Sequence, residues 1–370
     1  MQLRYLTSSS VVVENGETAV LCDPWLLDGA FYGAWANYPP LEFEPAAYDD
    51  VDYIYISDAY PDHFHQETME RLDTETPVLI HGDGTEFLKR SIEELGFEVT
   101  ELPLAERCHL ATDLSLNIVG ADGRGPSGSA SHGESEPVGE PDGGQLVESQ
   151  PQADTMAVFD DGEHVLVNAN DCQWPLAERA CSVVDDEYDG VDMLLVQYAA
   201  TNFYPQCMLD YSHEEKLAAR SEVIEEVYRN AEGFINALEP DHFMPFAGSY
   251  LLSGSLAALN EYVAAPTPDD AFWHFMGSNS IEPDDSDPLL LNSEAVFDLE
   301  RQEASEGYTP VDRSKRSAYI EEVLAARSLE YEADDCPTRS ELTALLDRAY
   351  HHMDEQRRAL GWASDTTVLL

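Results

Sequence analysis

The first 26 residues alternate between apolar and polar positions, with the period of two that is typical of β-strands. The alternation is interrupted at Glu14–Glu17, where a central Asn-Gly pair predicts a hairpin. A nearly continuous apolar run at residues 51–57 predicts a strand that is covered on both faces of its sheet. Further strands are predicted at residues 77–84, 97–103, 114–120, 154–171 (two strands joined by an Asp-Gly turn), 189–198 and 242–248.

Helical patterns follow several of these strands, at residues 66–72, 84–96 and 212–238, with two more within 308–361. The helix at 212–238 begins with a capping box formed by Ser212 and Glu215. Strands followed by helices predict a layered α/β sandwich. Residues 122–152 are rich in Gly, Ser, Pro and Glu, so we expect a disordered acidic insertion loop there. The final residues, 365–370, predict a strand without an evident partner.

The chain is strongly acidic: 73 Asp and Glu against 19 Lys and Arg give a net charge of -54. Such a surface repels phosphate groups, so we expect no nucleic-acid partner and no anionic membrane partner. The acidic residues are spread over every segment, and only three of the basic residues are Lys. This composition is typical of a protein adapted to high salt, where screening suppresses the repulsion between like charges.

The six cysteines are scattered and form no Cys-x-x-Cys pair. Their spacing therefore predicts neither a disulfide framework nor a thiolate zinc site. The N-terminus lacks the pattern of a signal peptide, and no apolar run approaches the length of a membrane span. From these patterns we expect a cytoplasmic protein with reduced thiols. The sequence does not indicate an oligomeric state.

Metal-binding side chains follow three of the predicted strands. Asp23 comes after the strand that ends at Cys22, and Asp171 comes after the apolar run at 165–170. The third group, which follows residues 51–57, consists of Asp58, Asp62, His63 and His65. The ends of neighbouring strands share a crevice, and a divalent cation needs several N or O donors from such segments. We therefore expect these side chains to converge.

Four stretches of this sequence resemble the metallo-β-lactamase superfamily, and most of all the lactamase-like part of CMP-N-acetylneuraminate hydroxylases: residues 22–26, 53–64, 166–175 and 242–248. The resemblance implies a four-layer αββα sandwich with its active site along one edge. It places this domain at residues 1–290 and leaves a C-terminal helical segment at 300–370. It also implies a metal site and a small-molecule substrate.

The family's His-x-His-x-Asp-His motif corresponds here to residues 58–63, where Asp58 and Tyr60 replace the first two histidines. A later histidine of the family pattern falls near Gln150, so the first metal position is largely lost. The resemblance implies that Asp58, Asp62, His63 and Asp171 hold one divalent metal, with Mn, Fe or Zn as candidates. Asp58 or Asp171 would then act as general base, and Tyr60 would face the substrate.

Simpler interpretations remain for several of these residues. Tyr60 could be a packed aromatic. Asp62 could cap the helix at 66–72, Asp58 could form a turn, and Asp23 is expected to orient the loop rather than bind metal.

Three functions follow from the resemblance. The first is a single-metal hydrolase that acts on a small anionic or sugar-nucleotide-like substrate. The second is a non-catalytic binding partner. The third is an oxygenase component that needs a separate Rieske protein, because Cys108-His109 is no Rieske ligand pair.

Overall fold

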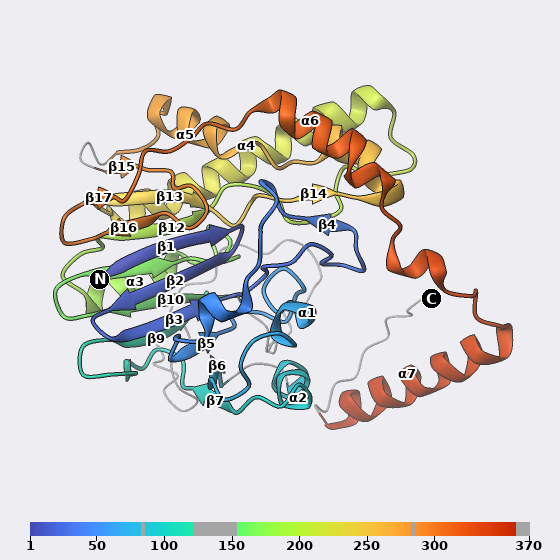
Figure 1. Cartoon of the computed structure of the whole chain (residues 1–370), viewed down its shortest axis with the longest axis horizontal. Coiled ribbons are helices and arrows are strands. Elements are labelled where there is room, and N and C mark those ends of the chain that lie inside the picture. Colours follow the sequence, from blue (N-terminus) through green and yellow to red (C-terminus); the bar gives the residue numbers. More distant parts are fainter. Residues whose placement is uncertain (83–85, 122–153, 283–285, 360–370) are drawn as a thin grey trace, which may run out of the picture. The chain divides into compact units, whose positions relative to one another are not determined.

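The computed structural model describes residues 1–82, 86–121, 154–282 and 286–359 (Figure 1). The chain divides into two compact units, residues 1–328 and 329–370. The insertion loop predicted at 122–152 and the strand predicted at 365–370 lie outside the described residues.

The first unit contains an eight-stranded sheet in which the predicted N-terminal hairpin is present. Strands β1 to β3 pair antiparallel, with Asn15 opposite Thr18 across the turn. β3 then pairs parallel with β5, which continues parallel to β6 and β7. In spatial order the strands are β17 (Glu303–Ala304), β16 (Val296–Asp298), β1 (Gln2–Thr7), β2 (Ser10–Asn15), β3 (Thr18–Cys22), β5 (Tyr53–Tyr55), β6 (Val78–His81) and β7 (Val99–Leu102).

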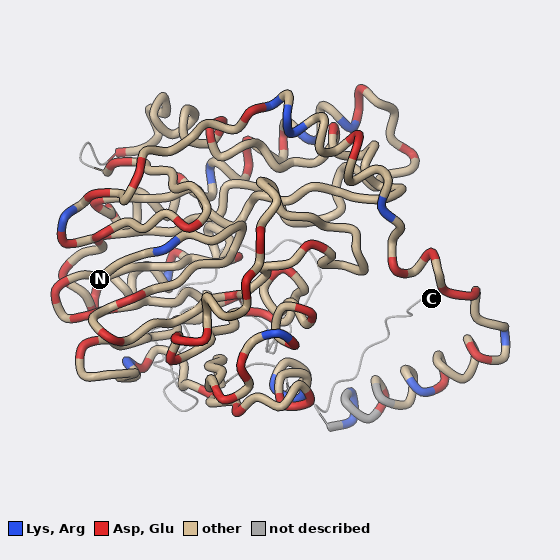
Figure 2. Tube along the Cα trace, viewed as in Figure 1, with Lys and Arg blue, Asp and Glu red and all other residues tan. Residues whose placement is uncertain are grey.

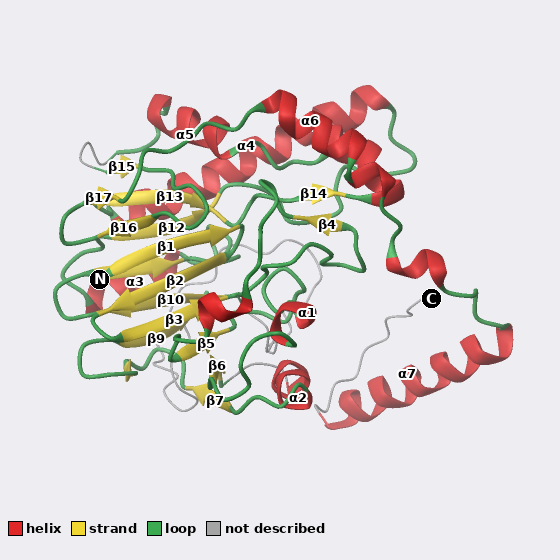
Figure 3. Cartoon of the chain, viewed as in Figure 1, coloured by secondary structure: helices red, strands yellow, loops and turns green. Residues whose placement is uncertain are grey.

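A second sheet of seven strands faces the first (Figure 3). β9, β10 and β11 pair antiparallel, whereas β11, β12, β13 and β15 pair parallel. The spatial order is β15 (Asp287–Pro288), β13 (His242–Phe246), β12 (Met193–Gln197), β11 (Val165–Asn168), β10 (Thr155–Asp160), β9 (Ser115–Gly120) and β8 (Cys108–His109).

Helices cover the outer face of each sheet. α1 (Gln66–Met69) and α2 (Glu86–Glu94) pack on the first sheet through one apolar cluster. α3 (Glu178–Glu187), α4 (His213–Leu238) and α5 (Pro268–Gly277) contact strands of the second sheet. The inner faces of the two sheets share the main hydrophobic core. This arrangement confirms the predicted αββα sandwich, and α4 begins with the predicted capping box.

Smaller elements complete the unit. β4 (Trp35–Ala36) pairs with β14 (Leu251–Leu252), and the 3₁₀ helices are η1 (Pro45–Tyr48), η2 (Gly254–Tyr262) and η3 (Leu324–Ala326). The first unit extends beyond the predicted boundary at residue 290 for two reasons. β16 adds to the edge of the first sheet, and α6 (Arg313–Glu322) supplies Tyr319 and Ile320 to a cluster with Leu251.

The second unit contains η4 (Glu330–Ala333) and α7 (Arg339–Ala359). Helix α7 confirms the helix predicted near the end of the chain. Asp and Glu are distributed along both units rather than gathered in one segment (Figure 2). Adaptation to high salt stays a prediction. No helix in the described ranges is long and apolar enough to cross a membrane.

Candidate functional site

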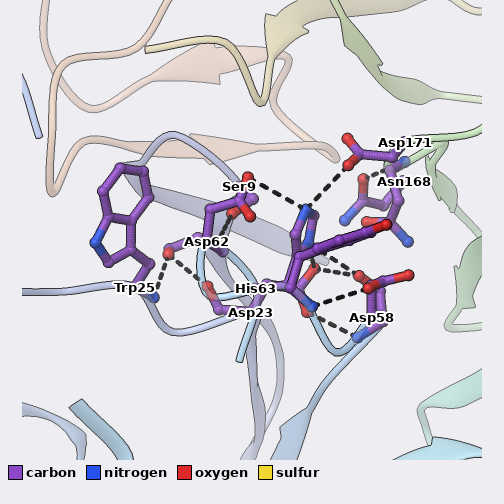
Figure 4. A network of polar contacts seen from close by, with 12 residues as sticks. Ser9, Asp23, Trp25, Asp58, Asp62, His63, Asn168 and Asp171 are labelled. Atoms are coloured by element: carbon purple, nitrogen blue, oxygen red, sulfur yellow. Dashed lines mark hydrogen bonds and ion pairs between the residues drawn. The ribbon is translucent and has the colours of Figure 1, made fainter. Parts of the chain in front are cut away.

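Side chains that follow three of the predicted strands, among them Asp23, His63 and Asp171, lie close together (Figure 4). β3 and β5 are parallel neighbours, so Asp23 and the segment after β5 leave the sheet side by side. Asp171 arrives from the loop after β11 in the facing sheet. The carboxylate of Asp171 comes within 3.3 Å of the His63 ring. Donor groups from both sheets therefore meet here.

Asp23 holds the loop that carries these residues. Its carboxylate accepts hydrogen bonds from the backbone N–H and the hydroxyl of Ser57, both at 2.7 Å. The same carboxylate lies 3.0 Å from Nδ1 of His63. Asp23 is fully buried and has a left-handed backbone, with φ of 45°. Its side chain thus fixes the His63 ring, in agreement with its expected orienting role.

The other ring nitrogen of His63 faces the crevice. Nε2 lies 3.3 Å from Oδ2 of Asp171 and 3.9 Å from Oδ2 of Asp62. Burial alone lowers the pKa of this imidazole, but the surrounding carboxylates outweigh that effect and hold the pKa well above its usual range. The carboxylates around His63 therefore favour its protonated form.

Asp62 does not cap helix α1, because the residue at the N-cap position is His65. Asp62 is 5% exposed, and its backbone carbonyl accepts a hydrogen bond from the Ser9 hydroxyl at 2.6 Å. Burial, with a further contribution from the negative charge of Asp171, raises the pKa of Asp62 to about 6. Burial destabilises the ionised form of Asp62, so a positive charge beside this carboxylate would stabilise it.

The structure also contains the turn that was the alternative role for Asp58. One carboxylate oxygen of Asp58 accepts the backbone N–H of Tyr60 at 2.9 Å. Burial raises the pKa of Asp58. Tyr60 itself is 57% exposed and lines a pocket, so it is not a packed core aromatic.

His65 serves a structural purpose. Its Nδ1 lies 2.9 Å from the hydroxyl of Thr68, and burial lowers its pKa to about 4. A buried neutral imidazole that is already hydrogen-bonded within its own helix start is not available to the site.

The sequence prediction missed Asp154. Burial raises the pKa of Asp154 to about 6, and the charges of Asp171 and Asp58 add to the effect. Asp154 precedes β10, whose antiparallel pairing with β11 puts the start of one strand beside the end of the other. A search limited to residues that follow strands overlooks Asp154, which precedes one. The predicted hairpin at 154–171 nevertheless begins at Asp154 and ends at Asp171, which indicates that the two residues lie at the same end of the strand pair.

A pocket of about 670 Å³ opens beside these groups. Three of its carboxylates come from the strand edge, and Gln197 orients one of them by donating a hydrogen bond to Asp171 at 2.8 Å. Among the residues that the structure describes, the lining contains no Lys, Arg or His. The lining is Phe31, Trp35, Tyr60, Asp62, Asp154, Asp171, Gln173, Gln197, Ala200, Thr201, Asn202, Phe203, Tyr204, Val223, Glu226, Val227 and Asn230.

Within the described part of the chain, no group of three or more His, Cys, Asp or Glu side chains is arranged as a ready metal site. The predicted set is split: Asp58 is engaged in its turn, and His63 is paired directly with Asp171. The donor chemistry still fits a cation, because Asp62 and Asp154 are buried carboxyl groups with raised pKa values, and a cation that replaces the proton on Nε2 of His63 would offset the repulsion between the carboxylates.

Comparison with known proteins supports the fold. Residues 2–111 match the family described as Beta-lactamase superfamily domain. A structure described as a possible metal-dependent hydrolase from Veillonella parvula aligns with a TM-score of 0.51 at 13% identity, over 80% of this chain and 98% of that chain. An isothiocyanate hydrolase from Delia radicum gut bacteria aligns with a TM-score of 0.51 at 12% identity, over 80% and 99% of the two chains.

Two sequence relatives are larger proteins. A protein of Mycolicibacterium smegmatis described as a Rieske 2Fe-2S iron–sulfur protein is 26% identical over 211 residues, which cover 55% of this chain and 35% of the relative. The cytidine monophosphate-N-acetylneuraminic acid hydroxylase of Cricetulus griseus is 21% identical over 264 residues, which cover 68% and 41%. This chain thus matches less than half the length of these curated relatives. The sheet order, the matched domain and the structural neighbours together show that the chain has the metallo-β-lactamase fold.

Proposed function

We propose that this chain is a metal-dependent hydrolase in which Asp62, His63 and Asp171 hold one divalent cation. The observation that carries the proposal is the environment of His63, whose Nδ1 is held by Asp23 while Nε2 faces two carboxylates. A metal-binding histidine commonly has this arrangement, in which the ring nitrogen that does not bind the metal donates a hydrogen bond to a carboxylate. The oxygen-rich donor set favours Mn²⁺ or Fe²⁺ over Zn²⁺.

A bound divalent cation would supply the Lewis acidity that hydrolysis needs. The residues of the chain would supply the rest. Gln197 keeps Asp171 in position through its hydrogen bond, and the exposed ring of Tyr60 lies on the substrate side. Asp154, with a pKa of about 6, can accept or release a proton near neutral pH, and it joins Asp58 and Asp171 as a candidate general base.

The test is metal content after dialysis against Mn²⁺. We expect about one ion per chain in the natural protein, because one histidine and two carboxylates suffice for a single site. His63→Ala should lose the bound ion. His213→Ala is the matched control, since His213 is exposed at the start of α4, outside the site. Thermal unfolding of each variant shows whether it is folded. Equal Mn²⁺ content in His63→Ala and the natural protein would contradict the proposal.

The named relatives favour a second candidate, an oxygenase component that receives electrons from a separate Rieske protein. The observation behind it is that the aligned relatives include a hydroxylase and a protein described as a Rieske iron–sulfur protein. This alternative requires iron in the same site and O₂ consumption only when a Rieske reductant protein is added. Iron-loaded protein that consumes no O₂ with such a reductant rules it out.

A further inference from the structure

The pocket beside the site is negatively charged on two of its walls. Asp62, Asp154 and Asp171 contribute from the strand edge, and Glu226 contributes from helix α4. Glu226 shares its helix face with Val223, Val227 and Asn230, which have the spacing of neighbours on one side of a helix. An anionic substrate, as expected from the family resemblance, would enter a pocket whose described lining has four carboxylates and no cationic side chain.

A further wall is aromatic. Phe31 lies 4.4 Å from Trp35 between ring centroids, and Phe203 lies 6.1 Å from Phe31. Trp35 is itself stacked on Tyr250, with centroids 3.8 Å apart and an interplanar angle of 14°. This stacking holds the Trp35 ring in position before any ligand arrives.

The backbone that carries this wall has an uncommon conformation. Phe31 and Tyr32 have φ angles of 56° and 62°, in a region that non-glycine residues rarely adopt. Such strain is concentrated at ligand-binding and catalytic sites.

We propose that this pocket binds an organic cation: an ammonium group on an aromatic or apolar body. Because Asp62 and Asp171 hold the metal in the proposed hydrolase, the organic cation would lie between the carboxylates of Asp154 and Glu226 and the faces of Phe31 and Phe203, where ring electrons attract positive charge. The acidic surface would raise the local concentration of such a ligand at low ionic strength. The inference names the substrate class of the proposed hydrolase, and so rests on that proposal.

Three probes of matched shape test the charge: 2-phenylethylamine, 2-phenylethanol and 3-phenylpropionate. Calorimetry at one fixed salt concentration should show the amine binding about tenfold more tightly than the alcohol, with the carboxylate weakest. Glu226→Gln should reduce the preference for the amine several-fold. Glu222→Gln, one turn earlier on α4 and outside the pocket lining, should leave it unchanged. Equal binding of amine and alcohol, or tighter binding of the carboxylate, overturns the inference.

The same protein samples separate this inference from the hydrolase proposal. Each titration is repeated on Mn²⁺-loaded and chelator-treated protein. A preference for the amine in protein that binds no metal supports the pocket's specificity and contradicts the hydrolase. Stoichiometric Mn²⁺ binding together with tighter binding of 3-phenylpropionate supports the hydrolase and contradicts the organic-cation inference. Phe203→Ala should weaken the amine and the alcohol, because both probes place a ring on that wall.

Discussion

Nδ1 of His63 lies 3.0 Å from the carboxylate of Asp23, and both side chains are buried. Asp23 also accepts two hydrogen bonds from Ser57, which hold its carboxylate in place. A rotation of the His63 ring would break its contact with this fixed carboxylate. The imidazole is therefore oriented before any ligand binds, with Nε2 toward Asp171. The proposed metal site depends on this orientation.

Asp23→Asn tests this dependence. Loss of the carboxylate should weaken Mn²⁺ binding by about 10- to 100-fold, the usual effect of removing the partner of a metal-binding histidine. Calorimetric titration measures the affinity. Ser57→Ala removes the hydroxyl that donates to Asp23 and lies 3.1 Å from Nδ1 of His63, but it leaves the Asp23 carboxylate in place, so it should cause a smaller loss. Unchanged affinity in folded Asp23→Asn would show that Asp23 does not act through His63.

Asp154 should make stability depend on pH in chelator-treated protein. Burial raises its pKa from 3.8 to about 6, so between these values the folded state keeps a proton that the unfolded state has released. Stability therefore falls as pH rises from about 4 to 6. Asp154→Asn should raise the free energy of unfolding at pH 7 by on the order of 2 kcal/mol, and by much less at pH 4. Urea unfolding at both pH values measures the difference, and an equal effect at both would contradict the assignment.

Gly233 tests the packing of α4 on the loop after β11. A Cβ atom at this position would lie 2.6 Å from a ring carbon of Trp174. Gly233→Ala should therefore destabilise the protein by about 1–3 kcal/mol, although alanine is the better helix former. Gly277→Ala in α5 is the matched control, because its Cβ would meet nothing within 4 Å and should not destabilise. If Gly233→Ala stabilises the protein, the helix and the loop are not packed as described.

Local signals account for what the sequence predicts well. The turn near Gly16 and the capping box of Ser212 and Glu215 depend on residues that are adjacent or one helical turn apart, and both are present. The strand-end residues Asp23 and Asp171 were found because parallel neighbours expose their ends at one edge.

Features that depend on tertiary placement were not found. Asp154 reaches the site only through the antiparallel pairing of its strand. The aromatic wall joins Phe31 and Phe203, which lie in loops far apart in the sequence and carry no periodic pattern. Residues beyond 290 join the first unit through pairing of β16 with β1, which apolar periodicity does not predict.

The most direct test of the central claim is the anomalous scattering of crystals soaked in Mn²⁺. We predict one strong peak bounded by Nε2 of His63 and the carboxylates of Asp62 and Asp171, at about 2.0–2.3 Å from its ligands. The peak should be missing from His63→Ala crystals of the same form. A structure in which Mn²⁺ binds only elsewhere, or in which the His63–Asp171 contact persists at saturating Mn²⁺ without a peak, would contradict the account.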